Sequence, residues 1–356
     1  MPERRGCLGI RAVFTAFCLT DWRVGIEGLN RHLPALCRGP DLRLGPPSEQ
    51  FLGVGGRIPA EIGHHREVTD YITKNFDPSS TSAAEADFLR FRQARHTHVT
   101  SARGPLALVS TTRIDRKCEI DGVPGLWAPL AVGVSGVQVT AQLSDGILVD
   151  GEAVDSSIDV VGSDAIAPST LAFGASGAVT GTVFPSVDGG YIVRVWDSAN
   201  DRAESFDRIS AYDYDPAWVV TGTFTATDPG RVIGIQHTAD GDRTHDQLLP
   251  GDIDVVISGK SLRLVAFVDD PAEAWHPTSR LKLVFQDFTT GDTTYDVGRF
   301  LEVRPDADGS VVLDFNRAYI PPCAFSDFFN CPMPPAENRL QLAVTAGEKR
   351  VLSYPG

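Results

Sequence analysis

Short stretches in which apolar and polar residues alternate dominate the chain from Pro105 onward. Apolar residues recur at every second position, which is the period of a half-buried β-strand, and glycine, aspartate, serine and threonine separate the stretches as turns do. This pattern predicts a mainly β fold, either a β-sandwich or a partly closed β-barrel. The predicted strands are PLALVSTTRI, LWAPLAVGV, VQVTAQL, GAVTGTVF, YIVRVW, AWVVTGTF, RVIGIQH, DIDVVI, SLRLVAFV, RLKLVFQ, VGRFLEV, VVLDF and LQLAV.

One segment before these strands has a helical period. Ser82 precedes AAEADFLRFRQARH, and Glu85 follows three residues later, as in a capping box. We therefore predict one N-terminal amphipathic helix that packs on the β-strands. Its two stripes are Ala86, Leu89 and Gln93 on one side and Phe88, Phe91 and Arg95 on the other.

His96 and His98 follow this predicted helix at a spacing that would place both on one face of a strand. A zinc site needs three or four donors, and no third donor lies nearby in the sequence. We interpret the two histidines as surface residues and predict no metal site.

Residues 1–80 show neither period, and glycine and proline recur in them. We predict that 1–80 form a poorly ordered or loosely attached N-terminal extension, and that 81–356 form a single β-rich domain.

The charge of the chain bears on its partners and location. The net charge is -14, and residues 1–80 hold 10 basic and 9 acidic side chains, so the acidity belongs to the later residues. Nucleic-acid binding needs clustered lysine and arginine, so we expect no nucleic-acid partner. Arg11 interrupts the first apolar run, and no apolar stretch is long enough to span a membrane. We predict a soluble, cytoplasmic protein without a membrane partner.

The loop ADGDRTHDQ places Asp240, Asp242 and Asp246 close together. A calcium loop of the EF-hand type needs glycine at its sixth position and glutamate at its twelfth, which here is Gly251. Neither residue is present, so we interpret the segment as a solvated acidic loop.

The stretch RLKLVFQDFTTGDTTYDVGRFLEV predicts a hairpin with two charges on otherwise apolar faces. Strand parity places Asp287 on the face of Phe285, and Arg299 on the face of Leu301. If residues 288–292 form the turn, the two charges lie at opposite ends of the hairpin and have separate partners. Buried charges are costly unless they are paired, so both are candidate site residues.

A second role for Asp287 remains open. Its carboxylate is well placed to accept hydrogen bonds from Thr289 and Thr290, which would make it structural rather than catalytic.

Two polar residues precede a proline-rich loop. In VVLDFNRAY, Asp314 and Asn316 share one face of the predicted strand, opposite the apolar residues. They either line a pocket or satisfy the backbone of the loop that follows, in which the prolines supply no N–H groups.

Cys323 and Cys331 lie in this loop and admit three interpretations: buried thiols, a disulfide, or half of a metal site. Cys118 is the only other cysteine after residue 80, so the metal interpretation ranks last.

Four stretches carry a resemblance to a known family: FLRFRQARHTHVTSARGPLALV, YIVRVWDSANDRAESFDRISAYDYDPAWVV, FQDFTTGDTTYDVGRFLEV, and DFNRAYIPPCAFSDFFNCPMPPAENRL with its trailing AGEK. Over roughly residues 83–349 the chain resembles the domain of unknown function family number 1684. The resemblance implies no assigned reaction or partner, and the cofactors are unknown. Ile320 stands where the family favours asparagine. The positions it singles out are Arg194, Asp197, Phe206, Asp287, Thr289, Gly291, Tyr295, Arg299, Asp314, Asn316, Pro322, Cys323, Cys331, Pro332, Asn338 and Glu348.

Two hypotheses for function follow. The first is a small-molecule-binding or structural β domain with a pocket near the Pro/Cys loop, because pockets of such folds open at strand ends. Its oligomeric state stays open, its structural residues are Cys323 and Cys331, and its ligand-binding candidates are Arg194, Tyr295, Asn338 and Glu348.

The alternative is a hydrolase-like enzyme. Asp287 or Asp314 would be its general base, and Arg299 or Asn316 would stabilise developing negative charge. This hypothesis requires at least two of these groups to face one open cavity.

Overall fold

The structure is a computed structural model that describes residues 82–354 except 175–176, 187–188, 229 and 269–279. It is mainly β with several antiparallel sheets, and none of the sheets in the described residues closes into a barrel. The mainly β prediction is therefore confirmed. The extension predicted for residues 1–80 lies outside the described residues, and no helix among the described residues is long and apolar enough to cross a membrane.

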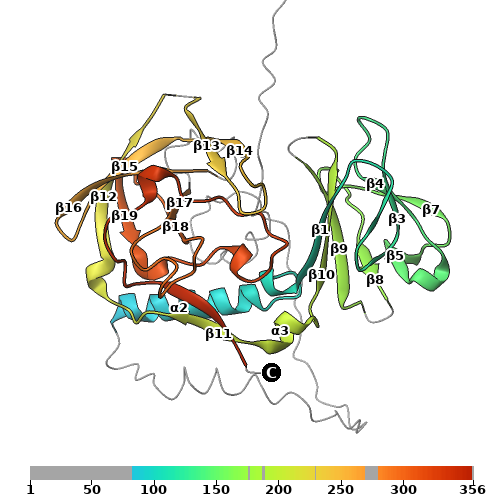
Figure 1. The fold of residues 1–356 in the computed structure, drawn as a ribbon, viewed down its shortest axis with the longest axis horizontal. Coiled ribbons are helices and arrows are strands. Elements are labelled where there is room, and N and C mark those ends of the chain that lie inside the picture. The colour runs from blue at the N-terminus through green and yellow to red at the C-terminus, as the bar shows by residue number, and fades with distance from the viewer. Residues whose placement is uncertain (1–81, 175–176, 187–188, 229, 269–279, 355–356) are drawn as a thin grey trace, which may run out of the picture. The chain divides into compact units, whose positions relative to one another are not determined.

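Two sheets are built from the first half of the described chain (Figure 1). One is six-stranded, in the order β1-β10-β9-β8-β5-β6, with β1 Leu108–Ile114, β5 Ile147–Val149, β6 Glu152–Ala153, β8 Leu171–Phe173, β9 Val179–Pro185 and β10 Tyr191–Asp197. The other is four-stranded, in the order β2-β3-β4-β7, with β2 Cys118–Ile120, β3 Val123–Pro129, β4 Val137–Thr140 and β7 Ser157–Val160.

One hydrophobic cluster joins these two sheets into a sandwich. It contains alternate residues of strands from both sheets, as expected when each strand turns one face inward. Trp127 of β3 is fully buried at its centre, and its ring lies 6.5 Å from that of Phe173 on β8.

The second half of the described chain forms four smaller sheets. A four-stranded sheet has the order β16-β15-β12-β19, and three pairs join β11 to β20, β13 to β14 and β17 to β18. Their bounds are β11 Phe206–Ala211, β12 Val219–Ala226, β13 Val232–Gln236, β14 Thr244–Leu248, β15 Gly251–Ile257, β16 Lys260–Ala266, β17 Leu281–Phe285, β18 Arg299–Val303, β19 Ser310–Asp314 and β20 Glu348–Ser353.

These sheets have a hydrophobic cluster of their own, which shares no residue with that of the sandwich. Phe285 of β17 and Phe315 meet edge to face inside it, with ring centroids 5.6 Å apart. Six short 3₁₀ helices connect the strands in the described residues: η2 Pro105–Ala107, η3 Leu143–Asp145, η4 Pro216–Trp218, η6 Phe315–Arg317, η7 Pro322–Ala324 and η8 Ala336–Asn338.

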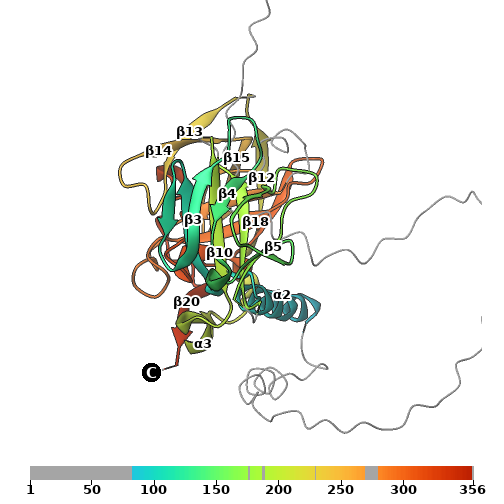
Figure 2. The ribbon, with the colours of Figure 1, turned by 90° about the vertical axis from the view of Figure 1, so that its right-hand side faces the viewer.

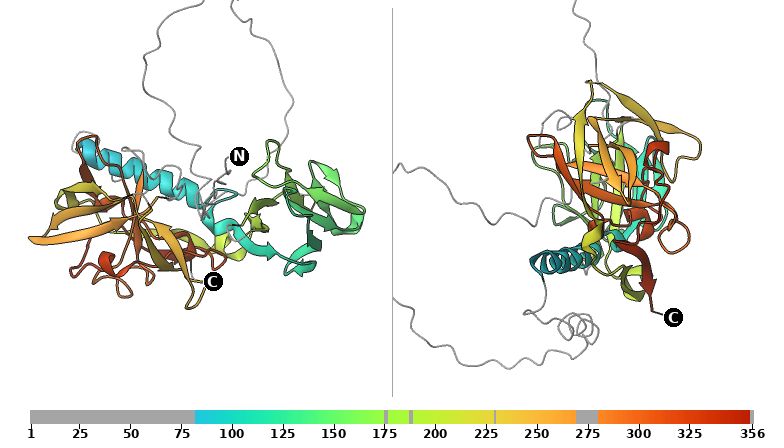
Figure 3. Two further views of the ribbon diagram at one scale, coloured as in Figure 1. Left: turned by 90° about the horizontal axis from the view of Figure 1, so that it is seen from above. Right: turned by 90° about the vertical axis from the view of Figure 1, so that its left-hand side faces the viewer.

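The predicted N-terminal helix is α2, Ala83–Val99, and a second helix, α3, spans Asp201–Ser205. The α2 helix lies beside β11 in Figure 1 and is the long blue-to-cyan helix of Figure 3. Arg92 donates a hydrogen bond to Ile209 O of β11 at 2.7 Å, and Arg95 Nε bonds Glu348 of β20 at 2.9 Å. Figure 2 shows β20 next to α3, where Tyr354 N–H bonds Ser205 O.

Three local predictions need correction. His96 and His98 lie in the last turn of α2 rather than after the helix. The acidic loop is shorter than predicted, because its second half is strand β14. The segment LQLAV has the alternating burial of a strand but makes only isolated backbone bonds to the chain that follows β17, from Leu340 N–H to Gln286 O and from Phe288 N–H to Leu342 O. The last strand begins at Glu348 instead.

Gly347 allows the chain to enter β20 at this point. Its φ is +78°, and an added Cβ would lie 2.5 Å from Ala318 O and 2.8 Å from Phe315 O. We expect Gly347→Ala to lower the free energy of unfolding by at least about 2 kcal/mol, because left-handed strain and the clash with two carbonyls add. Guanidinium unfolding measures this change.

Gly151→Ala is the matched control, since Gly151 has a φ of +85° and open space around its Cβ position. Gly151→Ala is expected to lower the free energy of unfolding by only about 1 kcal/mol, which is the cost of the left-handed backbone conformation. Equal losses for the two variants would contradict the close approach at Gly347.

Candidate functional site

Asp287 and Arg299 form one buried ion pair. Arg299 Nη2 lies 2.6 Å from Asp287 Oδ2, and both side chains are fully inaccessible to solvent. Thr289 donates its backbone N–H and its hydroxyl to Asp287 Oδ1, at 2.7 and 2.6 Å. The carboxylate is therefore saturated by partners inside the protein.

The prediction of separate partners for the two charges was wrong, and the reason is the register. In the β17–β18 ladder Arg299 pairs with Phe285 rather than with Leu281. Residues 286–298 form the connection, so Asp287 folds back over Arg299 as it leaves β17. The predicted bond from Thr289 is present, whereas the Thr290 hydroxyl accepts from Asp287 N–H.

Arg299 also bonds the backbone at the end of the segment that holds LQLAV. Leu340, Leu342, Val344 and Ala346 are buried alternately, as in a strand. Arg299 donates to Val344 O at 2.9 Å and to Ala346 O. A side chain thus bonds the carbonyls that a neighbouring strand would otherwise satisfy.

Asp314 and Asn316 hold the backbone rather than face an open space. Asn316 is 1% exposed, and its amide bonds both the N–H and the C=O of Asp215, at 2.9 and 3.0 Å. Asp314 accepts from the backbone N–H and side-chain amide of Asn316, and Arg317 Nε lies 3.2 Å from its other oxygen. The backbone that these two side chains bond is that of Asp215, before β12, and that of Asn316, rather than the backbone of the proline-rich loop that follows.

Asn338 joins two sheets. Its side chain is fully buried, accepts from Val265 N–H, and donates to Val265 O and Val284 O, each at 2.9 Å. Val265 belongs to β16 and Val284 to β17, which lie in different sheets. All of its hydrogen bonds within the described residues go to backbone, so a ligand-binding role gains no support.

Glu348 forms a second buried ion pair with helix α2. Arg95 Nε and Nη2 lie 2.9 and 3.0 Å from its two oxygens, and Ile320 N–H donates to it at 3.0 Å. Burial works to lower the pKa of Arg95, but the charge and hydrogen bonds of Glu348 outweigh it and raise that pKa. Arg92 lies 3.7 Å from Glu348, and burial lowers its pKa.

The sequence did not predict this second pair. The predicted stripe with Phe88 and Arg95 is the buried one, and an arginine between aromatic residues on a packed stripe was the available signal. Ile320, the departure from the family pattern, is fully buried among apolar side chains and uses its backbone at the pair.

Tyr295 and the two cysteines lie together in the Pro/Cys loop region. Cys323 and Cys331 are thiols rather than a disulfide, and Cys323 N–H donates to Cys331 Sγ at 3.4 Å. Tyr295 donates its hydroxyl to Cys323 O at 3.1 Å, and burial raises the pKa of this phenol. Hydrogen bonding to Cys331 lowers the pKa of Cys323.

Arg194 lies on the outer face of β10, between two aromatic rings. Its guanidinium carbon is 5.2 Å from the Phe184 centroid and 5.6 Å from that of Phe329 in the Pro/Cys loop. Such stacking is a cation–π contact, which is worth roughly 0.5–2 kcal/mol.

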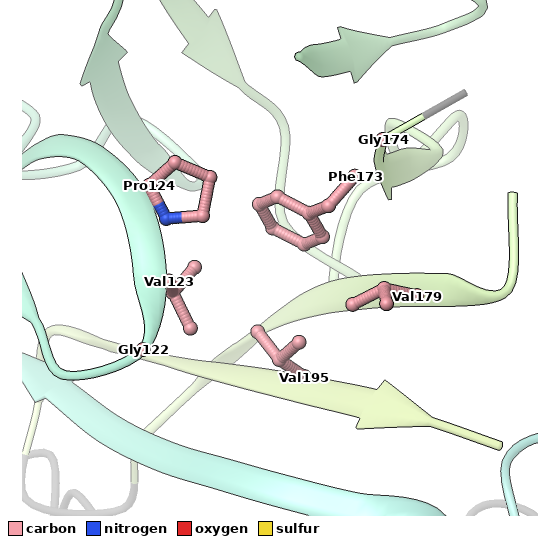
Figure 4. A pocket seen from close by; sticks show the side chains of 7 residues that line it. All are labelled: Gly122, Val123, Pro124, Phe173, Gly174, Val179 and Val195. Atoms are coloured by element: carbon pink, nitrogen blue, oxygen red, sulfur yellow. The ribbon is translucent and has the colours of Figure 1, made fainter. Parts of the chain in front are cut away.

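A half-open cavity of about 260 Å³ lies at one end of the sandwich, between its two sheets. Val123 and Pro124 of β3 line one side, and Phe173, Val179 and Val195 line the other (Figure 4). None of the side chains that line it is polar. The predicted pocket was near the Pro/Cys loop, whereas none of the residues lining this cavity comes from that loop.

Comparison with known proteins gives a family. The model of the family described as Protein of unknown function (DUF1684) matches residues 204–349, a shorter range than the resemblance over 83–349. The solution NMR structure of an uncharacterized protein of Haloarcula marismortui is 40% identical, covering 40% of this chain and 77% of that chain, with a TM-score of 0.33. Among curated proteins, none matches the chain.

Proposed function

Because the chain belongs to the DUF1684 family, described only as proteins of unknown function, we propose a function from its geometry: it is a small-molecule-binding β protein that holds an apolar ligand in the cavity of the sandwich. The observation that carries this proposal is a half-open cavity lined by apolar side chains (Figure 4). Small-molecule sites in proteins are usually concave and mostly apolar, as this cavity is.

The size of the cavity indicates the ligand. A dry apolar cavity of about 150 Å³ is large enough for benzene. The volume here is about 260 Å³, so a somewhat larger hydrocarbon fits. Without polar side chains in the lining, binding depends on the burial of apolar surface, and it favours ligands without charge.

The hydrolase alternative receives no support from the described residues. Asp287, Arg299 and Asn316 are sealed from solvent and bonded to protein groups. Asp314 is partly exposed, but one of its oxygens caps η6 and the other lies beside Arg317. Catalysis needs two such groups at one open cavity, and the cavity described above contains none of them.

Calorimetry with butylbenzene tests the proposal. We expect the complete protein to bind it with a negative heat-capacity change, the signature of apolar burial. Val179→Phe places a ring in the cavity and is expected to weaken binding at least about tenfold.

Val134→Phe is the matched control. It makes the same change at an exposed position beyond the other end of β3 and should leave the affinity unchanged. No binding by the wild type, or equal affinity of Val179→Phe and wild type, would refute an apolar ligand site.

A cytoplasmic location belongs to the same proposal. Cys118, Cys323 and Cys331 form no disulfide among the described residues, which supports a reducing compartment, because oxidising compartments favour disulfides. The acidic composition supports a partner other than nucleic acid.

A further inference from the structure

The hairpin of β13 and β14 brings two histidines and an aspartate together. In its ladder Ile235 pairs with His245, and His237 follows the last residue of β13. Asp240 lies in the connection between the strands. One donor atom of each of the three side chains lies within 4.8 Å of the others.

The atoms of this His–Asp–His cluster that could bind a metal lie close to one another. His245 Nε2 lies 2.8 Å from Asp240 Oδ2, and the two imidazole rings meet edge to face with centroids 5.0 Å apart. His237 Nδ1 is buried and has no hydrogen-bond partner among the described residues. A buried ring nitrogen without a partner is costly, and a bound cation would remove that cost.

The Pro/Cys loop fixes the position of this cluster. Asn330 donates to Asp240 Oδ2 at 2.8 Å and accepts from Ala239 N–H at 2.8 Å. Thr238 N–H bonds Cys331 O, and Cys331 N–H bonds the Thr238 hydroxyl. Carboxylates that bind metals are commonly held by such outer hydrogen bonds.

We propose that His237, Asp240 and His245 bind a divalent transition-metal ion of the zinc class, with Asn330 orienting the carboxylate. Imidazole nitrogen suits zinc and its neighbours, whereas calcium and magnesium prefer oxygen donors. Three protein donors leave the fourth tetrahedral position open to water or a small ligand.

The sequence did not predict this cluster. The three aspartates of the acidic loop pointed to a calcium motif, which the loop does not match. Of those three aspartates only Asp240 belongs to the cluster. The two histidines are contributed from either side of the turn, so their proximity depends on the register of the hairpin.

Titration of the complete protein with ZnCl₂ tests the proposal, with a parallel titration with MgCl₂. We expect one zinc site that is lost in Asp240→Asn and weakened at least about tenfold in His237→Gln, and no comparable binding of magnesium. Co²⁺ in place of zinc should give the visible absorption of a four- or five-coordinate ion in the wild type.

Asp242→Asn is the matched control, because it removes the same charge from the same turn at an exposed residue outside the cluster. It should bind zinc like the wild type. Equal zinc affinity of all four proteins, or the octahedral spectrum of solvated Co²⁺ in the wild type, overturns the proposal. The Co²⁺ spectrum of the wild type tests the proposed site even if a variant fails to fold.

Discussion

Arg299→Met is expected to lower the free energy of unfolding by about 3–5 kcal/mol, because it leaves the Asp287 carboxylate buried without a cation. Arg299 also bonds two carbonyls of the segment Leu340–Ala346, so both its charge and its hydrogen bonds are lost. Guanidinium unfolding gives the total change, and hydrogen exchange of β17 and β18 locates it.

Arg263→Met is the matched control for this prediction. Arg263 forms a two-bond pair with Asp254 on the surface, at 2.8 and 3.0 Å. Solvent screens this pair, so its loss should leave stability unchanged within error. A similar loss of stability in both variants would show that burial does not govern the energy of the Asp287 pair.

Glu348→Ala is the second change with a large expected effect, again about 3–5 kcal/mol. It removes the carboxylate that holds Arg95, which is 7% exposed, and leaves the Ile320 N–H without its acceptor. Thermal and guanidinium unfolding measure the loss, and hydrogen exchange of α2 should rise.

The double variant Arg95→Met/Glu348→Ala is expected to lose less than the sum of its single changes, because no buried charge is left without its partner. Arg90→Met, on the exposed side of the same helix, should cost only about 0.2–0.5 kcal/mol. Strict additivity in the cycle would contradict a direct Arg95–Glu348 interaction.

Local periodicity accounts for what the sequence could predict. The alternation of apolar and polar residues along the sequence identified most of the longer strands. It also placed Arg299 on an inward face, where the structure shows it to be fully buried. The stripe of α2 with Phe88 and Arg95 was also visible. These predictions succeed because the side-chain period is a property of a few adjacent residues.

Contacts between distant residues could not be read in the same way. Arg95 and Glu348 are 253 residues apart, and nothing local specifies their pairing. The prediction of the β17–β18 register was wrong for a related reason. The length of the connection between these strands depends on the turn around Asp287 and Thr289, which strand parity does not specify. The alternating segment Leu340–Ala346 resembled a strand because burial alternates in any extended chain, with or without a ladder.

The candidate sites lay outside these predictions for two reasons. The residues singled out by polarity on an apolar face proved to be bonded mainly to one another and to backbone, as buried polar groups usually are. The half-open cavity is lined by ordinary apolar residues of four different segments, so no motif marks it. The His–Asp–His cluster forms only when β13 and β14 pair.

The Arg95–Glu348 pair also constrains the order of events during synthesis. Glu348 follows Arg95 by 253 residues, so at about 5–20 residues per second it leaves the ribosome roughly 10–50 s later. During that interval Arg95 of the nascent helix cannot pair with Glu348, so its guanidinium remains hydrated or pairs with another carboxylate. Final docking of the helix is therefore a late step that waits for β20.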